Sequence, residues 1–308
     1  MQREKGKKAI FAEIWKAKYL YLMLLPFLAW LIVFKYGPMY GVIIAFKDYT
    51  ARLGIWGSEW VGLKHFVKIF STPKAMEAII NTVIISFGRL IFEFPIGIII
   101  AILLAEMPGR KVKKVYQTLF TFPHFLSWVV VATILKNFLS LDGPVNQWLM
   151  NLGVEPVSFL GTNSLFRPLL YITANWKEMG WSAIIFIAAI AGIDPTLYEA
   201  AEIDGASRLQ RIWHVTLPGI RTTIVVMLIL AVGGIMNAGF EQVFNLRNAM
   251  TADAARMLDT YVYDITFSNA PNYSFSSAVG LFKSVINLLL LLTANKLSQK
   301  LTGSKAIG

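Results

Sequence analysis

The sequence predicts an all-α integral membrane protein with six transmembrane helices, and three observations lead to this fold class. The 308 residues are 56% hydrophobic and only 15% charged, and the mean hydropathy is +0.57, whereas a soluble domain usually carries about a quarter charged residues. The apolar residues form continuous runs rather than alternating with polar ones, which excludes transmembrane strands. The Lys and Arg residues gather in short clusters between these runs, as they do in membrane proteins.

Each predicted span has the roughly 20 mainly apolar residues that a transmembrane helix needs. In order, the predicted spans are residues 19–40, 79–105, 115–138, 169–193, 222–243 and 278–294. The fourth span departs most from this pattern, because the polar sequence Asn-Trp-Lys-Glu interrupts it at 175–178. In the fifth span, Gly233 and Gly234 favour close helix packing or a kink.

The distribution of cations predicts the orientation of the chain in the membrane. Six Lys and Arg residues precede Tyr19, against two Glu residues, and four more lie in the turn at 108–114. Because cytoplasmic segments carry the excess of cations, an even number of spans places both termini in the cytoplasm. The first apolar run is long and no small-residue cleavage site follows it, so we expect an uncleaved signal-anchor.

Several kinds of chemistry find no support in the sequence. The chain has no Cys, and its three His residues (His65, His124 and His214) lie far apart, so we predict no disulfide, no catalytic residue and no metal site. No Walker A pattern is present, so any ATP chemistry must come from another chain. The net charge of +11 does not form a basic stripe on a polar domain. We therefore expect contact with membrane lipid and not with nucleic acid.

The segment at 194–218 is amphipathic rather than apolar and lies on the side assigned to the cytoplasm. Asp194 can cap a first helix whose opening residue is a proline. Gly205 can end that helix with a positive φ, and Ser207 can begin a second helix. We expect the second helix to stop at the Leu-Pro pair at 217–218.

This segment resembles the EAA loop of ABC importer permeases. The resemblance rests on Glu199, Ala200, Ala201 and Gly205, followed after nine residues by Val215-Thr216-Leu217-Pro218. Val215 stands where the family usually has Ile. The resemblance implies a type I ABC importer transmembrane-domain fold, in which this loop forms a coupling helix that docks in a cleft of the ATP-binding subunit. The coupling residues would be Glu199, Ala200, Ala201, Gly205, Leu217 and Pro218. The alternative is an interfacial helix-turn-helix that only links two spans.

Further segments are similar to sugar-importer permeases related to the maltose system, and the C-terminal third is similar to LplB-type permeases. The matching segments are WVGL at 60–63, NT at 81–82, NAGFEQ at 237–242, DTYVY at 259–263 and AVGLFKS at 278–284. Glu241 stands where we expect Asp in the LplB subgroup. The resemblance implies an oligosaccharide substrate.

The same resemblance implies a multi-subunit importer in the bacterial cytoplasmic (inner) membrane. Its other parts would be a second homologous permease, two ATP-binding subunits that hold ATP and Mg²⁺, and an extracellular solute-binding (lipo)protein. This chain would be a transport subunit without a cofactor and without an ATPase site of its own. Residues 1–76 would form the cytoplasmic N-terminus, first helix and outer loop, 77–298 the permease core, and 299–308 the cytoplasmic tail.

Polar side chains at membrane depth are candidates for a substrate cavity, because a charge there is costly unless it is paired or hydrated. The predicted cavity residues are Trp176, Lys177 and Glu178 in the fourth span and Asn237, Phe240, Glu241 and Phe244 in the fifth. An aromatic ring beside amides and charges suits a sugar, whose C–H faces stack on the ring while its hydroxyls form hydrogen bonds. Asn237, Glu241 and Asn245 recur every four residues, so they would stripe one side of a helix.

The same residues could instead have structural roles. The fourth span could break at 175–178 and leave its polar residues in a water-filled gap between subunits, and the stripe on the fifth span could join helices. Arg89 and Glu93 are four residues apart, which permits an ion pair, with cavity lining as the alternative. Two other functions are compatible with the sequence. An ion-coupled secondary transporter would use Glu93 or Glu178 as proton sites, and a non-transporting membrane scaffold would use neither.

Overall fold

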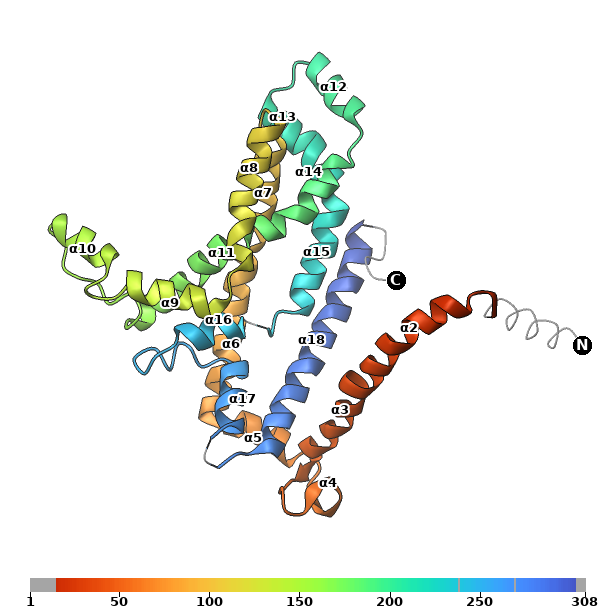
Figure 1. The fold of residues 1–308 in the computed structure, drawn as a ribbon, viewed down its shortest axis with the longest axis vertical. Coiled ribbons are helices and arrows are strands. Elements are labelled where there is room, and N and C mark those ends of the chain that lie inside the picture. Colours follow the sequence, from red (N-terminus) through yellow and green to blue (C-terminus); the bar gives the residue numbers. More distant parts are fainter. Residues whose placement is uncertain (1–14, 238, 269, 303–308) are drawn as a thin grey trace, which may run out of the picture. The chain divides into compact units, whose positions relative to one another are not determined.

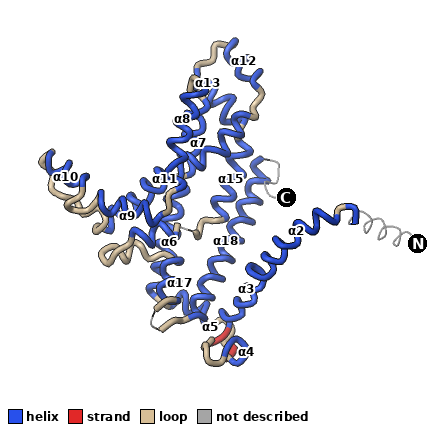
Figure 2. The backbone as a smooth tube through the Cα atoms, in the orientation of Figure 1, coloured by secondary structure: helices blue, strands red, loops and turns tan. Residues whose placement is uncertain are grey.

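The computed structural model describes residues 15–237, 239–268 and 270–302. Within these residues the chain is mostly helical, with one pair of short strands (Figure 2). The chain separates into two compact units, residues 1–66 with 272–281 and residues 67–271 with 282–308. The cations at positions 3–8, which contribute to the predicted orientation, lie outside the described residues.

The first unit contains the first predicted span. A helical run of 29 residues extends from Lys18 to Phe46, so the span predicted at 19–40 is confirmed and continues beyond its predicted end. The run consists of α2 (Lys18–Leu31), the π-helical η1 (Ile32–Tyr36), α3 (Gly37–Met39) and the 3₁₀-helical η2 (Tyr40–Phe46).

Two short strands organise the loop that follows. Strand β1 (Lys47–Asp48) pairs antiparallel with β2 (Glu59–Trp60), and α4 (Gly54–Gly57) lies between them in the chain. His65, in α5 (Lys64–Ser71), is buried, and its Nε2 lies 3.0 Å from Oδ1 of Asp48. The β1–β2 pairing and the contact between His65 and Asp48 together hold the two ends of this loop close to each other.

The second unit is organised around two long helical runs (Figure 1). Helices α6 (Pro73–Phe92) and α7 (Phe94–Ala105) form a run of 33 residues that contains the second predicted span, and α11 (Asn163–Ala191) packs along α7. Gly97 permits this approach, because a Cβ atom there would lie 2.7 Å from Oγ of Ser182. Helix α11 contains most of the fourth predicted span and passes through the Asn-Trp-Lys-Glu sequence without a break, so the alternative of a helix that breaks there is wrong.

The third predicted span is not one straight helix. Helix α8 (Arg110–Thr121) continues into the 3₁₀-helical η3 (Phe122–Phe125), and α9 (Trp128–Phe138) then departs at 96°. Leu126 is extended, with φ −76° and ψ 136°, and the side chain of Ser127 caps the new helix. The expectation of a continuous helix over 115–138 is therefore wrong, because a proline in η3 and a new N-cap both favour a break.

The fifth predicted span is broken as well. Helix α15 (Arg221–Gly233) ends in its glycine pair, and α16 (Phe240–Leu246) begins after Gly239, whose φ is +79°. Gly233 packs closely, since a Cβ atom there would lie 2.6 Å from Cδ1 of Leu291. Asn237 lies outside both helices, so the predicted stripe with Glu241 and Asn245 along one helix does not exist.

The remaining elements of the second unit are shorter, apart from the last. Helix α10 (Pro144–Asn151) follows α9, and α17 (Leu258–Thr266) follows a non-helical segment that folds onto α6. Asn81 in α6 donates a 2.7 Å hydrogen bond to the carbonyl of Asp253, and Thr82 Oγ1 accepts a 2.8 Å bond from the amide of Leu258. Two residues of α6 thus hold this segment in place.

Helix α18 (Tyr273–Thr302) contains the sixth predicted span, and its residues fall in both units. By length and composition, three helical runs of the described residues could each cross a membrane, and three bent helix pairs raise the number to as many as six. The predicted number of six therefore stands only if each bent pair counts as one span.

Candidate functional site

The predicted coupling loop forms at one end of the second unit (Figure 1). Helix α12 (Pro195–Ile203) begins where predicted, and Oδ1 of Asp194 accepts a 3.0 Å hydrogen bond from the amide of Thr196. This bond stabilises the carboxylate and holds the pKa of Asp194 below its ordinary value. The predicted cap is confirmed.

The turn after α12 also follows the prediction. Gly205 has φ +75°, and the space around it is open, since a Cβ atom would meet no heavy atom within 4 Å. Helix α13 (Arg208–Arg211) starts with a capping box in which the Ser207 amide donates a 2.7 Å bond to the Gln210 side chain. The requirement for glycine is therefore conformational and not steric.

The helix does not stop at Leu217 and Pro218, so that expectation is wrong. The π-helical η4 (Ile212–Thr216) and α14 (Leu217–Gly219) continue α13, and the chain bends by 63° before α15. Pro218 is tolerated because it directly follows the π-helical turn η4, where the regular i→i−4 hydrogen-bond ladder is already interrupted. Hydroxyls of Tyr198 and Thr216 lie 3.0 Å apart and connect α12 to this base.

The tip of the coupling loop is more apolar than the motif suggests. Glu199 and Ala200 are exposed and Ala201 is half-buried. Around them four large apolar side chains are also exposed, namely Leu197, Ile203, Leu209 and Trp213. An exposed apolar surface of this kind is typical of a protein-binding site. Ile203 is 87% exposed, and sequence reasoning did not single it out.

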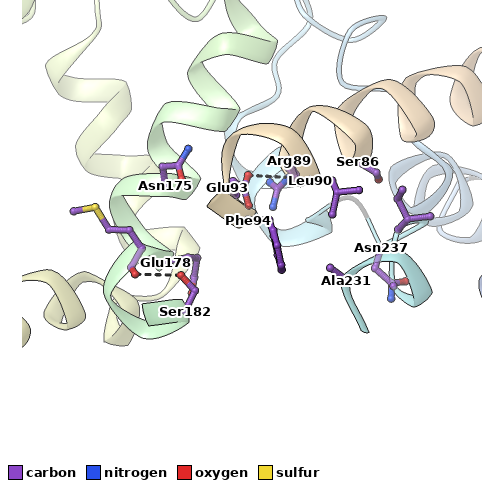
Figure 3. A pocket seen from close by; sticks show the side chains of 13 residues that line it. Ser86, Arg89, Leu90, Glu93, Phe94, Asn175, Glu178, Ser182, Ala231 and Asn237 are labelled. Carbon is purple, nitrogen blue, oxygen red and sulfur yellow. Dashed lines mark hydrogen bonds and ion pairs between the residues drawn. The ribbon is translucent and has the colours of Figure 1, made fainter. Parts of the chain in front are cut away.

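A cavity of about 290 Å³ lies among α6, α7, α11, α15 and the break in the fifth span (Figure 3). Its lining residues are Ser86, Arg89, Leu90, Glu93, Phe94, Asn175, Glu178, Met179, Ser182, Ala231, Gly234, Ile235 and Asn237. Glu178 and Asn237 were predicted for a cavity and line this one. Arg89 and Glu93 line it too, so the ion pair and the cavity-lining alternative both apply to them.

The other predicted cavity residues lie elsewhere. Lys177 is buried, whereas Trp176 and Glu241 are exposed on their helices. Phe240 and Phe244 pack against each other with ring centroids 5.2 Å apart. For the fifth span, the break explains why only Asn237 lines the cavity. Asn237 precedes α16, so it does not share a helix with Phe240, Glu241 and Phe244.

One wall of the cavity is a polar network that joins three helices. The Arg89 Nε and Glu93 Oε1 atoms are 3.6 Å apart (Figure 3). The guanidinium of Arg89 also donates to Oε1 of Gln242. Gln242 is fully buried and donates 2.8 Å bonds to the Leu170 carbonyl and to Oγ1 of Thr173. Gln242 therefore links α6, α11 and α16.

A second cluster forms where the third span bends against α11. His124 Nδ1 lies 2.6 Å from Oε2 of Glu178, and its ring stacks on Trp181 with centroids 4.2 Å apart at 3°. Lys177 Nζ donates a 2.7 Å bond to the His124 carbonyl and lies 3.0 Å from Oε1 of Glu178. Its ammonium also lies 5.5 Å from the ring centre of Trp128.

Sequence reasoning missed this cluster. His124 lies 54 positions before Glu178, and an isolated histidine gave no sign of a partner. Pro123 beside it could have marked the end of the helix that carries His124 to α11. The arrangement brings hydrogen-bond donors, acceptors and ring faces together beside α11.

The family of the chain follows from comparison with known proteins. A family model for the binding-protein-dependent transport system inner membrane component matches residues 94–303. The chain belongs to this family. This match confirms that the chain is an inner-membrane component of a transport system. It also confirms the type I ABC importer permease fold that the sequence predicts.

Members of this transport-system family resemble the chain over nearly its whole length. The polygalacturonan/rhamnogalacturonan transport system permease protein YteP of Bacillus subtilis (strain 168) is 44% identical over 97% of this chain and 93% of its own. Protein LplB of the same strain is also 44% identical, over 94% of this chain and 91% of its own. The predicted similarity to LplB-type permeases is therefore confirmed.

A solved structure shares the fold of this inner membrane component. It is the crystal structure of a bacterial alginate ABC transporter in complex with an alginate pentasaccharide-bound periplasmic protein. One of its chains is 37% identical, with a TM-score of 0.87, and the match covers 96% of this chain and 99% of that chain. The family favours an ABC importer permease over both an ion-coupled secondary transporter and a non-transporting scaffold.

Proposed function

We propose that this chain is a permease subunit of an ATP-driven ABC importer for oligosaccharides. The observation that carries the proposal is the coupling loop, in which two capped helices meet at Gly205 and expose an apolar tip. The named substrates of YteP and of the alginate transporter are polysaccharides or their fragments, which supports the substrate class. A second homologous permease completes the translocation pathway.

In this proposal the coupling loop transmits the movement of two ATP-binding subunits. Glu199, Ala200 and Ala201 enter a cleft on the ATP-binding subunit, where the small alanine side chains allow close approach. Leu217 and Pro218 belong to the helical base that carries this movement into α15. ATP and Mg²⁺ are held by the ATP-binding subunits and not by this chain. Their closure drives the spans between inward-facing and outward-facing states.

The cavity beside α11 receives the oligosaccharide from an extracellular solute-binding (lipo)protein. Glu178, Asn175 and Asn237 offer hydrogen bonds to sugar hydroxyls. Trp181, which stacks on His124 beside the cavity-lining Glu178, is 48% exposed, and an exposed ring of this kind can stack on the C–H face of a sugar. The charges of Arg89, Glu93 and Glu178 are balanced by nearby partners, so the cavity holds no large unpaired charge.

The same proposal places both termini in the cytoplasm. The turn at 108–114 carries four cations, and positive segments remain on the cytoplasmic side. The coupling loop then faces the ATP-binding subunits, and α17, at the other end of the second unit, faces outward (Figure 1).

Reconstitution tests the proposed function directly. The complex of this permease with its partner permease, ATP-binding subunits and binding protein is placed in proteoliposomes, and uptake of a galacturonan oligosaccharide is measured. We expect uptake that requires ATP and the binding protein and that persists when a protonophore collapses the proton gradient. Uptake driven by the proton gradient without ATP would show a secondary transporter instead, and no uptake of any oligosaccharide would contradict the substrate class.

A further inference from the structure

Four aromatic side chains of α16 and α17 form an aromatic platform, which we define as Phe240, Phe244, Tyr263 and Phe267. Ring centroids are 5.2 Å apart for Phe240 and Phe244, 4.6 Å for Phe244 and Tyr263, and 4.9 Å for Tyr263 and Phe267. Exposure increases along the platform, because Tyr263 is 37% exposed and Phe267 is 73% exposed. Phe240 packs instead against the buried core.

The platform has a fixed polar rim. Arg247 forms two 2.8 Å bonds to the carboxylate of Asp264, and its guanidinium lies 4.6 Å from the ring centre of Phe244. Paired and stacked in this way, the guanidinium and the carboxylate keep a defined orientation at the edge of the rings. About half of the Asp264 side chain remains accessible.

This combination of rings and paired charges matches a sugar better than it matches a lipid chain. A pyranose has apolar C–H faces and a rim of hydroxyls, and each hydroxyl both donates and accepts hydrogen bonds. A hydroxyl can therefore donate to Asp264 while it accepts from Arg247. A lipid tail would cover the rings but would also dehydrate the charged rim without replacing the hydrogen bonds that water makes there, which is unfavourable.

The platform is connected to the cavity by the chain itself. Asn237 lines the cavity, and Phe240 opens α16 three residues later. Gln242 of α16 accepts a hydrogen bond from Arg89, which also lines the cavity. The platform thus follows the cavity-lining Asn237 in the chain, is tied to the cavity wall by the bond from Arg89 to Gln242, and ends at its most exposed ring, Phe267.

We infer that the aromatic platform is a second sugar-binding site, which holds the units of an oligosaccharide that extend beyond the cavity. The inference rests on the proposed function and adds to it a preference for longer chains. The platform, with its Arg247–Asp264 rim, stacks sugar rings, whereas the cavity alone accommodates a short oligosaccharide.

Two variants test this site without disturbing the buried core. Phe267→Ala removes the most exposed ring, and Tyr263→Leu keeps an apolar side chain but removes the ring face. Trp148→Ala is the matched control, because Trp148 is an aromatic residue of α10 that is 62% exposed outside the platform. ATP-driven uptake of a disaccharide and of a pentasaccharide from the same galacturonan is measured in the reconstituted complex.

A lost ring contact is expected to raise the KM for the pentasaccharide roughly two- to tenfold. Disaccharide uptake, complex assembly and the Trp148→Ala control should stay at the wild-type level. The inference is overturned if both oligosaccharides are affected equally, if neither is affected, or if Phe267→Ala weakens assembly with the second permease, which would make the platform a subunit interface. A wild-type complex that transports no oligosaccharide would instead refute the proposed function.

Discussion

Replacing Gly239 by alanine perturbs the point where the break in the fifth span meets the cavity wall. Gly239 has φ +79°, a left-handed conformation that costs an L-residue about 1–2 kcal/mol. A Cβ atom there would lie 2.6 Å from Cζ of Arg89, so the guanidinium would have to leave Gln242. Losing a hydrogen bond to a charged group costs about 1.5–3 kcal/mol. Together these effects predict a destabilisation of roughly 2.5–5 kcal/mol.

The midpoint of thermal unfolding of the purified complex measures this loss. At about 2–4 °C for each kcal/mol, the midpoint should fall by roughly 5–20 °C. Gly280→Ala is the matched control, because Gly280 lies within α18 and a Cβ atom there would meet no heavy atom within 4 Å. Alanine is favoured over glycine inside a helix by about 1 kcal/mol, so this variant should keep or raise the midpoint.

A double-mutant cycle separates the two contributions. In an Arg89→Ala background the guanidinium is gone, so adding Gly239→Ala should cost only the roughly 1–2 kcal/mol of left-handed backbone strain. An equal loss of stability in both backgrounds would show that a Cβ atom at position 239 does not displace the Arg89 guanidinium from Gln242. A wild-type midpoint for Gly239→Ala alone would refute the whole argument.

Three further predictions concern topology, the cavity and the coupling loop. A cysteine replacing Lys111 should resist an impermeant thiol reagent in intact cells, whereas one replacing the exposed Arg52 should react, and equal labelling would contradict the orientation. His124→Phe keeps an aromatic ring but loses the bond to Glu178, so the unfolding midpoint should fall by an amount equivalent to about 1–2 kcal/mol; an unchanged midpoint would show that the bond contributes nothing. Because folding lowers the pKa of Asp194, its cap is fully present above the ordinary value near pH 4 and is lost as the pH falls through the lowered pKa. Hydrogen exchange in α12 should accelerate only in that acidic range and only with Asp194 present.

The sequence predicted best those spans that form long helical runs without a sharp bend. The first, second and sixth spans are such runs, and the structure contains all of them. The third and fifth are broken by local backbone chemistry, at Pro123 and at Gly239, that a hydropathy pattern does not register. The fourth span is continuous in spite of its polar residues, because Lys177 and Glu178 find partners across the helix packing.

The candidate sites differ in the same way. The coupling loop depends on neighbours in sequence, so Asp194, Gly205 and Ser207 could be assigned from their spacing. The cavity depends on tertiary contacts between distant segments. The contact of His124 with Glu178 depends on the packing of α8 and η3 against α11, which brings together two residues that lie 54 positions apart in the sequence.

The coupling loop is tested most directly by ATP hydrolysis in the reconstituted complex with and without the substrate-loaded binding protein. Ala201→Trp places a bulky side chain on the half-buried position of α12, and Ala249→Trp, at an exposed alanine between α16 and α17, is the matched control. We predict that Ala201→Trp leaves assembly with the second permease intact but abolishes stimulated hydrolysis and uptake, while Ala249→Trp retains both. Normal stimulation and uptake in Ala201→Trp would contradict the assignment of α12 as the helix that couples this permease to its ATP-binding subunits.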